Sequence, residues 1–347
     1  MEGKINELLK KPIHRILLTF LIVKVITIAV AFGLIYYAMK AEAYSRYLSI
    51  KNVSAEKVAK TIRGIEMSAQ NVFDEVSKHL DSPEAVIAAL ESKAGFNSDT
   101  RGYFAAFEQN YFPEQGTWFE PYIYQPDVTG FEYKQVGSAR HNYFKSPWYF
   151  RAKKSSQSFW SEPYFYYDGT SLSGQYCSFV KPIYDASGRL ACVCGADIKF
   201  DWLAQELAWE DESNKANRMQ NQFHLLKRHE FFSVILNNSD ASCVAYPEDK
   251  TLIITNKEVL KDLMQKRSGV VDMYVDGEAC TVYYGPIEFV DWTLAVVVPK
   301  LDLWTPLIPV VAVLLLITVI GLLIVRSVCR GVLRKSLQTS NITVCES

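Results

Sequence analysis

The apolar residues of this chain are gathered in two long blocks near its ends, while apolar and polar positions alternate between them. The first block, residues 16–39, contains one charge, Lys24, and the second block, residues 303–325, contains none. About 20 helical residues cross the hydrocarbon core of a bilayer, so both blocks predict transmembrane helices. The first block has a second interpretation as a cleaved signal peptide, because residues 41–43 (Ala-Glu-Ala) resemble a cleavage site. Its apolar run is longer than a typical signal core.

The basic residues beside the two blocks predict the orientation of the chain. Positive residues collect on the cytoplasmic side of membrane helices. Both outer flanks are basic, so we expect residues 1–15 and 326–347 to be cytoplasmic and residues 40–302 to be extracytoplasmic. The flanking charges are Lys4, Lys10, Lys11 and Arg15 before the first block, and Arg326, Arg330, Arg334 and Lys335 after the second.

Residues 41–90 have the pattern of a long helix. Apolar positions recur at a spacing near three and a half residues, with charges between them. Such a stripe packs either against its own domain or against a second copy of the helix, and we expect weak homodimerisation through it. Near the end, residues 82–84 (Ser-Pro-Glu) are typical of a helix start. The stripe consists of Val58, Ile62, Ile65, Val72, Val76 and Leu80.

Two sets of short strand patterns follow this helix. The first set, residues 102–200, includes the runs 175–184 and 189–198, which are joined by an Asp-Ala-Ser-Gly turn signal. The second set, residues 231–300, contains a hairpin with an Asp-Gly turn. A polar helical pattern over residues 202–228 separates the two sets. Antiparallel hairpins with segregated helices predict an α+β fold.

Composition and charge exclude several classes of function. The net charge is -1 and no basic cluster lies outside the termini, so we expect no nucleic-acid partner. The five histidines lack the spacing of metal ligands. The chain has no glycine-rich phosphate loop and no nucleophile elbow. We therefore expect no enzyme, no metal and no cofactor.

Five of the seven cysteines fall in the predicted extracytoplasmic region. Cys192 and Cys194 would share one face of a strand, where a disulfide between them is sterically poor. We interpret these cysteines as small buried hydrophobes. A cross-strand disulfide with Cys177 is left open.

A dense group of aromatic residues from Tyr143 to Tyr167 predicts a ligand pocket, which needs a few polar groups in an aromatic wall. Asp168 follows this group, and Asp197 lies near the end of the apolar run 190–198. A carboxylate there is costly unless it is capped, paired or met by a cationic ligand. The aromatic residues also fit a packed core. Asp197 also fits the N-cap of a helix beginning near residue 199.

The order of these elements and four short motifs resemble the double Cache sensor domains of bacterial receptors, over about residues 40–325. The resemblance implies two tandem PAS-like antiparallel-sheet units behind the long helix. The motifs are Ser146–Tyr149 (SPWY), Phe159–Tyr164 (FWSEPY), the hairpin from Pro182 to Ile198, and the run from Tyr284 to Pro299.

The resemblance also implies a ligand site. In amino-acid-binding members, an arginine and the motif tryptophan hold the ligand carboxylate, while the next tyrosine and a hairpin aspartate hold its amine. Here the arginine position is Ser146, and the neighbouring Lys145 cannot form a two-pronged clamp. We therefore expect a small ligand that bears an amine or a carboxylate. The candidate binding residues are Tyr143, Trp148, Tyr149, Tyr164, Tyr166, Asp168 and Asp197.

Three further segments are similar to the sensor halves of receptors that end in a sporulation stage II E-type serine phosphatase. They are Tyr103–Phe107, Trp118–Tyr124 and His141–Phe144. Those receptors continue past the second span into a HAMP linker and the phosphatase. Only 22 residues follow Val325 here, so we expect the output domain to be absent, in a truncated relative or in a fragment.

Together these patterns predict a two-pass receptor of the inner membrane. It would bind a small extracytoplasmic ligand, form a homodimer, and pass a signal to an unknown cytoplasmic output partner. The alternative is a membrane scaffold or adaptor that recruits a cytoplasmic partner without sensing a ligand. Stabilisation of the chain by a small molecule separates the two hypotheses.

Overall fold

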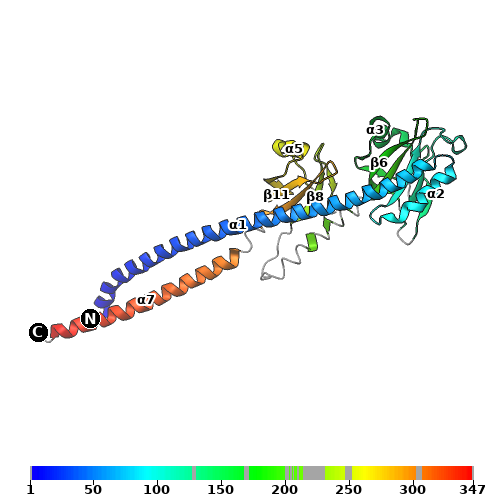
Figure 1. The fold of residues 1–347 in the computed structure, drawn as a ribbon. Coiled ribbons are helices and arrows are strands. Elements are labelled where there is room, and N and C mark those ends of the chain that lie inside the picture. Colours follow the sequence, from blue (N-terminus) through cyan, green and yellow to red (C-terminus); the bar gives the residue numbers. More distant parts are fainter. Residues whose placement is uncertain are drawn as a thin grey trace. The chain divides into compact units, whose positions relative to one another are not determined.

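The computed structural model describes residues 2–126, 130–167, 172–199, 203, 205, 207–208, 211–213, 231–246, 252–301 and 307–345 (Figure 1). Its contacts divide the chain into two compact units. A helical unit contains the residues up to Tyr47 and those from Pro299 onward. A sheet unit contains most of the chain between them and begins at Leu48. The helix predicted over residues 202–228 lies almost entirely outside the described residues.

The two terminal helices carry the apolar blocks. Helix α1 spans Glu2–Lys78 and helix α7 spans Leu307–Cys345. Both helices are long and apolar enough to cross a membrane, by length and composition. Their apolar side chains are exposed in the protein, with Leu34 at 68% and Leu323 at 61%. Surfaces of this kind are stable in hydrocarbon and unfavourable in water.

The first sheet of the sheet unit has seven strands in the order β3-β2-β1-β7-β6-β4, with β5 also paired to β6. Its pairings are antiparallel, and the β6–β7 hairpin forms its longest ladder. The hairpin turn is held by Asp185, whose Oδ1 accepts hydrogen bonds from the backbone N–H groups of Ser187 and Arg189. The strands are β1 (Gly102–Phe107), β2 (Pro121–Tyr124), β3 (Glu132–Gln135), β4 (Phe159–Trp160), β5 (Tyr164–Tyr166), β6 (Gly174–Tyr184) and β7 (Leu190–Lys199).

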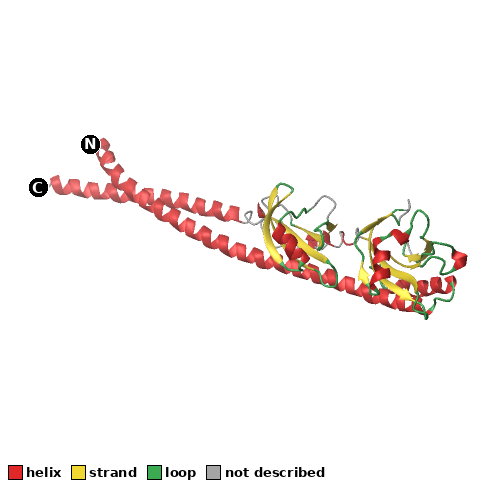
Figure 2. Cartoon of the chain, turned by 90° about the horizontal axis from the view of Figure 1, so that it is seen from above, coloured by secondary structure: helices red, strands yellow, loops and turns green. Residues whose placement is uncertain are grey.

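The second sheet has five strands in the order β10-β11-β12-β8-β9, and Figure 2 shows the strands of both sheets in yellow. Its β10–β11 hairpin turns at Asp276 and Gly277, both with positive φ, as the Asp-Gly signal predicts. The strands are β8 (Phe232–Asn237), β9 (Cys243–Ala245), β10 (Gly269–Val275), β11 (Glu278–Pro286) and β12 (Trp292–Pro299). Helix α5 (Lys257–Met264) precedes β10. The α+β fold with two antiparallel sheets is therefore confirmed.

The apolar stripe of α1 packs within its own unit. Ile62 is 2% exposed and Ile65 is fully buried, and both belong to a core cluster that includes residues of the first sheet. The prediction that this stripe forms a dimer surface is therefore wrong, because the domain core already covers it. The helix predicted over residues 41–90 is also two helices. Helix α1 ends at Lys78, and helix α2 (Pro83–Lys93) begins where Ser82 accepts a hydrogen bond from the Ala85 N–H.

The described cysteines are free thiols. Cys177, Cys192, Cys194 and Cys280 are buried, as expected of small hydrophobic side chains. The Sγ atoms of Cys192 and Cys194 lie 3.8 Å apart on one face of β7.

Candidate functional site

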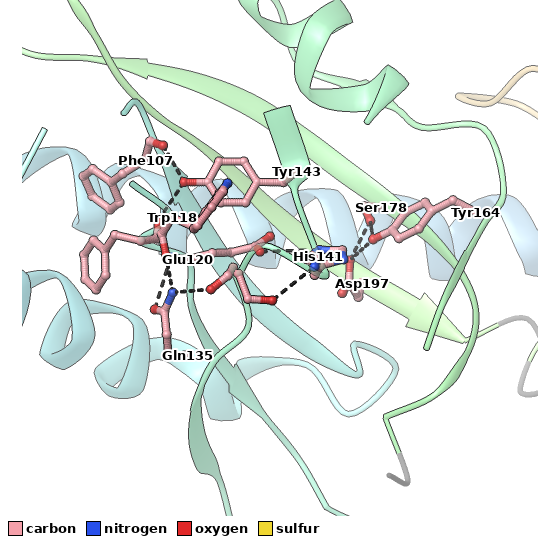
Figure 3. Close-up of polar contacts among 12 residues, drawn as sticks. Phe107, Trp118, Glu120, Gln135, His141, Tyr143, Tyr164, Ser178 and Asp197 are labelled. Carbon is pink, nitrogen blue, oxygen red and sulfur yellow. Dashed lines mark hydrogen bonds and ion pairs between the residues drawn. The ribbon is translucent and has the colours of Figure 1, made fainter. Parts of the chain in front are cut away.

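A cavity lies on one face of the first sheet, beneath helix α3 (Pro147–Ser155) and the strand β5. Its free space is about 30 Å³, which is room for about one water molecule. Aromatic rings, two acids and a histidine form its wall. Figure 3 shows four of the lining residues, Glu120, His141, Tyr164 and Asp197, with their polar contacts. The lining residues are Phe104, Glu120, Tyr122, Val136, His141, Trp148, Tyr164, Tyr166, Leu172, Tyr176 and Asp197.

Asp197 is a buried carboxylate held by neutral groups. It lies within β7, opposite Gly102 of β1 and Ser178 of β6, and is 7% exposed. Its Oδ1 accepts hydrogen bonds from Ser178 Oγ at 2.5 Å and from the Tyr164 hydroxyl at 3.3 Å. Because β7 continues to Lys199, Asp197 is a strand residue and does not cap a helix.

The surroundings of Asp197 set its charge. Burial raises the pKa of its carboxyl to about 7, and the hydroxyls of Ser178, Tyr164 and Tyr122 partly oppose that rise. The Tyr122 hydroxyl acts at longer range, because it forms no hydrogen bond in the described structure. At neutral pH the carboxyl is therefore divided between its acid and its carboxylate.

Glu120 is the second buried acid of the cavity. The residue is 3% exposed, and its Oε2 lies 3.5 Å from Nε2 of His141. Burial raises the pKa of Glu120 well above its ordinary value, and the charge of Asp197 raises it further. Burial lowers the pKa of His141, so its ring is favoured in the neutral form. The backbone N–H of Glu120 donates to Oε1 of Gln135, which fixes the approach to β2.

Trp148 supplies an unused donor. Pro147 occupies the first turn of α3, so Trp148 is placed at the start of that helix, where it is 4% exposed. Its ring packs against Phe104 with centroids 5.1 Å apart. Its indole N–H has no hydrogen-bond partner in the described structure. A buried donor without a partner is costly, so a ligand or a water molecule would complete it.

Only some of the candidate residues chosen from the sequence line the cavity. Trp148, Tyr164, Tyr166 and Asp197 line the cavity. The Tyr143 hydroxyl instead donates to the backbone carbonyl of Phe107 at 2.7 Å, and the Tyr149 hydroxyl donates to Glu108 at 3.1 Å. The hydroxyls of these two tyrosines therefore bond to groups outside the cavity, and neither residue lines it. Asp168 lies outside the described residues.

Several lining residues were missed in the sequence. Glu120 had a usable signal, since it is a lone acid in the aromatic run Trp118–Tyr124. His141 lies in the His-Asn-Tyr-Phe segment that was noted only as a resemblance. The others carry no polar signal that distinguishes a cavity wall from a core. The missed residues are Phe104, Glu120, Tyr122, Val136, His141, Leu172 and Tyr176.

A larger cleft of about 660 Å³ lies along α1 near β4. Its rim holds two ion pairs, Arg63–Glu66 at 2.9 Å, in which only Arg63 is exposed, and Lys266–Asp291 at 2.8 Å, in which both side chains are exposed. Exposed pairs of this kind are ordinary solvated surface. The small cavity, with its buried acids and its unused donor, is the stronger candidate site.

Residues 86–205 match the family described as "Methyl-accepting chemotaxis protein-like, first PDC sensor domain". The first sheet is similar to a chemoreceptor sensor domain. This match covers the strands that form the cavity, from β1 to β7. No curated protein sequence matches the chain.

Solved sensor domains share the fold of the chain. The periplasmic sensory domain of the Campylobacter jejuni chemoreceptor Tlp1 is 15% identical, with a TM-score of 0.59, over 75% of this chain and 95% of that one. The extracellular domain of the histidine kinase candidate mmHK1S-Z3 is 18% identical, with a TM-score of 0.58, over 76% and 96%. The ligand-binding domain of the Pseudomonas fluorescens chemoreceptor CtaA, in complex with L-isoleucine, is 18% identical, with a TM-score of 0.51, over 78% and 97%. At these identities the likeness shows the two-sheet sensor fold.

Proposed function

We propose that this chain is a ligand-sensing transmembrane receptor whose first PDC-type sheet binds a small amine-bearing cation against Asp197. The observation that carries the proposal is the carboxyl of Asp197, which is 7% exposed and faces a cavity. It forms no ion pair with any lysine or arginine of the described residues. A buried carboxylate without a cation is unfavourable, and a ligand ammonium would supply the missing charge.

The wall of the cavity suits a cation in two further ways. The rings of Trp148, Tyr122 and Tyr176 offer aromatic faces, which attract cations. The position where amino-acid-binding relatives carry an arginine is Ser146, so the strongest clamp for a ligand carboxylate is missing. The CtaA domain, which has the same fold, holds L-isoleucine, a ligand that bears an amine. These points favour the amine over the carboxylate as the group that is recognised.

A ligand screen tests the receptor proposal. The full chain, purified in detergent or nanodiscs, is heated with primary amines, amino acids and carboxylic acids. We expect amines to raise the unfolding temperature by mass action. At a ligand concentration of 100 Kd the free energy of unfolding should rise by about 2.7 kcal/mol. Stabilisation by carboxylic acids alone would contradict recognition of an amine. A chain that no compound stabilises would favour the scaffold hypothesis.

We also propose that the chain is a two-pass protein of the inner membrane with both termini cytoplasmic. Residues 16–39 and 303–325 would be the spans, and residues 40–302 would be extracytoplasmic. The basic flanks support this orientation. A reporter enzyme that works only in the cytoplasm should be active after Ser347 and silent in the Asp185–Gly188 turn. The reverse result would overturn the orientation.

For signalling, we propose a homodimer that passes the ligand signal to a cytoplasmic output partner. The exposed face of α1, which includes Val53, Lys60 and Met67, is available for pairing in the described structure. The similarity to the sensor halves of sporulation stage II E-type phosphatase receptors suggests a phosphatase as one such output. A coupling of about 1–3 kcal/mol between ligand and helix position is enough for a switch of this kind.

A further inference from the structure

We propose that Glu120 is a second ligand-binding group, and that the ligand carries two amino groups joined by a short alkyl chain. One ammonium group would meet Asp197, and the other would meet Glu120 beside His141. This inference rests on the proposed function of the cavity and adds the chemical class of the ligand.

The first step is the placement of the two acids. Glu120 lies directly before β2, and Asp197 lies near the end of β7, on the two strands that flank β1. Both side chains line the same cavity and are at most 7% exposed. Each carboxyl group is therefore shielded from bulk solvent and borders the cavity.

The second step is the absence of a fixed countercharge. Neither acid forms an ion pair with a lysine or an arginine among the described residues, and the nearest nitrogen base is the ring of His141 at 3.5 Å from Glu120. Arg101 acts on the Tyr122 hydroxyl, whose pKa it lowers in part. The other polar groups near Asp197 are the hydroxyls of Tyr122, Tyr164 and Ser178. The Tyr176 hydroxyl donates instead to the backbone carbonyl of Leu172.

The third step is charge balance. Two carboxylates in a water-poor cavity repel each other, and burial raises the pKa of both groups, which favours their protonated forms. A ligand with one ammonium compensates one carboxylate. A ligand with two ammonium groups compensates both and displaces more protons. The pair of acids therefore selects a dication over a monocation of the same length.

The shape of the cavity narrows the class further. Its free space of about 30 Å³ is smaller than a diamine, so wall side chains must move when the ligand enters, and a slender, unbranched chain requires the least movement. The unused indole N–H of Trp148 would donate a hydrogen bond either to a water molecule or to a ligand carboxylate. Both a plain diamine and a diamino acid therefore contain the proposed chemistry, and the experiment distinguishes them.

The test is isothermal titration of the full chain with 1-aminobutane, 1,4-diaminobutane and ornithine. We expect 1,4-diaminobutane to bind at least about tenfold more tightly than 1-aminobutane, as one further charge-assisted contact allows. Ornithine differs from 1,4-diaminobutane by the carboxylate alone. If ornithine binds more tightly than the diamine, the ligand is a diamino acid; if it binds less tightly, the ligand is a plain diamine.

The variants assign the preference to Glu120. Glu120→Gln should reduce the affinity for 1,4-diaminobutane to that for 1-aminobutane, while the affinity for 1-aminobutane stays within about twofold. Glu114→Gln, on an exposed turn, is the matched control and should change the affinity for neither amine. If Glu120→Gln loses affinity for both amines, Glu120 has a structural role and the inference is overturned. Equal binding of the two amines to the wild type would also overturn the inference.

A measurement on the wild type keeps the inference testable if Glu120→Gln does not fold. Titrations in buffers of different ionisation enthalpy count the protons that binding releases. We expect 1,4-diaminobutane to release more protons than 1-aminobutane, and equal release would contradict the inference. If 1-aminobutane binds but the diamine gains nothing, the receptor proposal stands and this inference fails. If no amine binds, the proposed function itself fails.

Discussion

The indole N–H of Trp160 donates a hydrogen bond to Oε1 of Glu66 at 2.9 Å, which joins β4 to helix α1. Trp160 is 9% exposed, and its ring packs against Phe179 of β6. Four residues further along the chain, Tyr164 contacts Asp197 in the cavity. One short segment therefore links the candidate binding site to helix α1, which also carries the N-terminal apolar block.

We expect Trp160 and Glu66 to be energetically coupled. A hydrogen bond to a charged group contributes about 1.5–3 kcal/mol, so a double-mutant cycle of Trp160→Phe and Glu66→Gln should give a coupling energy near that range. The measurement is denaturant unfolding of the full chain. A cycle of Trp160→Phe with Lys78→Gln, an exposed residue of α1 whose ion pair is with Glu75, serves as the control. A coupling energy no larger than in the control cycle would refute the link.

Two glycine substitutions should change stability in opposite directions. A Cβ on Gly195 of β7 would lie 2.1 Å from the ring of Phe104, so Gly195→Ala forces the cavity wall to move and should cost about 1–3 kcal/mol. Gly64 lies on the exposed face of α1, where an added Cβ has only Asn97 within 4 Å, at 3.8 Å. Gly64→Ala should therefore stabilise the chain by about 0.5–1 kcal/mol. Denaturant midpoints measure both, and equal effects would contradict the packing described for Phe104.

The carboxyl of Asp197 should make stability fall as the pH rises. The pKa of an ordinary aspartate is about 3.9, and burial raises that of Asp197 to about 7. Between about pH 4 and pH 7 the folded chain keeps a proton that the unfolded chain has lost, so unfolding releases it and the free energy of unfolding falls with pH.

The variant Asp197→Asn lacks this titration. The difference in unfolding free energy between wild type and variant should fall between about pH 4 and pH 7 and level off above about pH 7. His141, whose pKa burial lowers, contributes an opposite slope to both proteins and cancels in the difference. A difference that does not depend on pH would show that Asp197 is not protonated in the folded chain.

The burial of the α1 stripe predicts which cysteines cross-link. Ile62 is 2% exposed, while Met67 is 62% exposed on the opposite face. If two copies pair along α1, Met67→Cys should form an intermolecular disulfide in membranes and Ile62→Cys should not. Efficient cross-linking at Ile62 would mean that the stripe leaves its own core in the dimer. Maleimide labelling of both variants controls for accessibility.

Much of the fold follows from periodicity and turn residues. The β6–β7 hairpin and the β10–β11 hairpin were predicted because Asp-Ala-Ser-Gly and Asp-Gly fix their turns locally. The break before α2 was signalled by Ser82 and Pro83 for the same reason. The partner of the α1 stripe was not predictable, because an apolar helix face is the same whether it meets its own sheet or a second helix.

The candidate site was only partly predictable. Asp197 was found because a carboxylate in an apolar strand is costly, and Trp148 because it lies in the motif Ser146–Tyr149 that resembles the double Cache pattern. Tyr143 and Tyr149 look the same in sequence, but their hydroxyls bond to Phe107 and Glu108. Glu120 carried a local signal as a lone acid in an aromatic run, but its position in the same cavity as Asp197 depends on the long-range order of strands around β1.

The most direct test of the account compares amine binding by wild type and Asp197→Asn. Thermal shift of the full chain with 1-aminobutane and 1,4-diaminobutane reports binding, and Asp81→Asn, an exposed aspartate between α1 and α2, is the matched control. We expect both amines to stabilise the wild type and the control, and neither to stabilise Asp197→Asn, which should remain folded. Unchanged amine stabilisation in Asp197→Asn would contradict the assignment of this cavity as the ligand site.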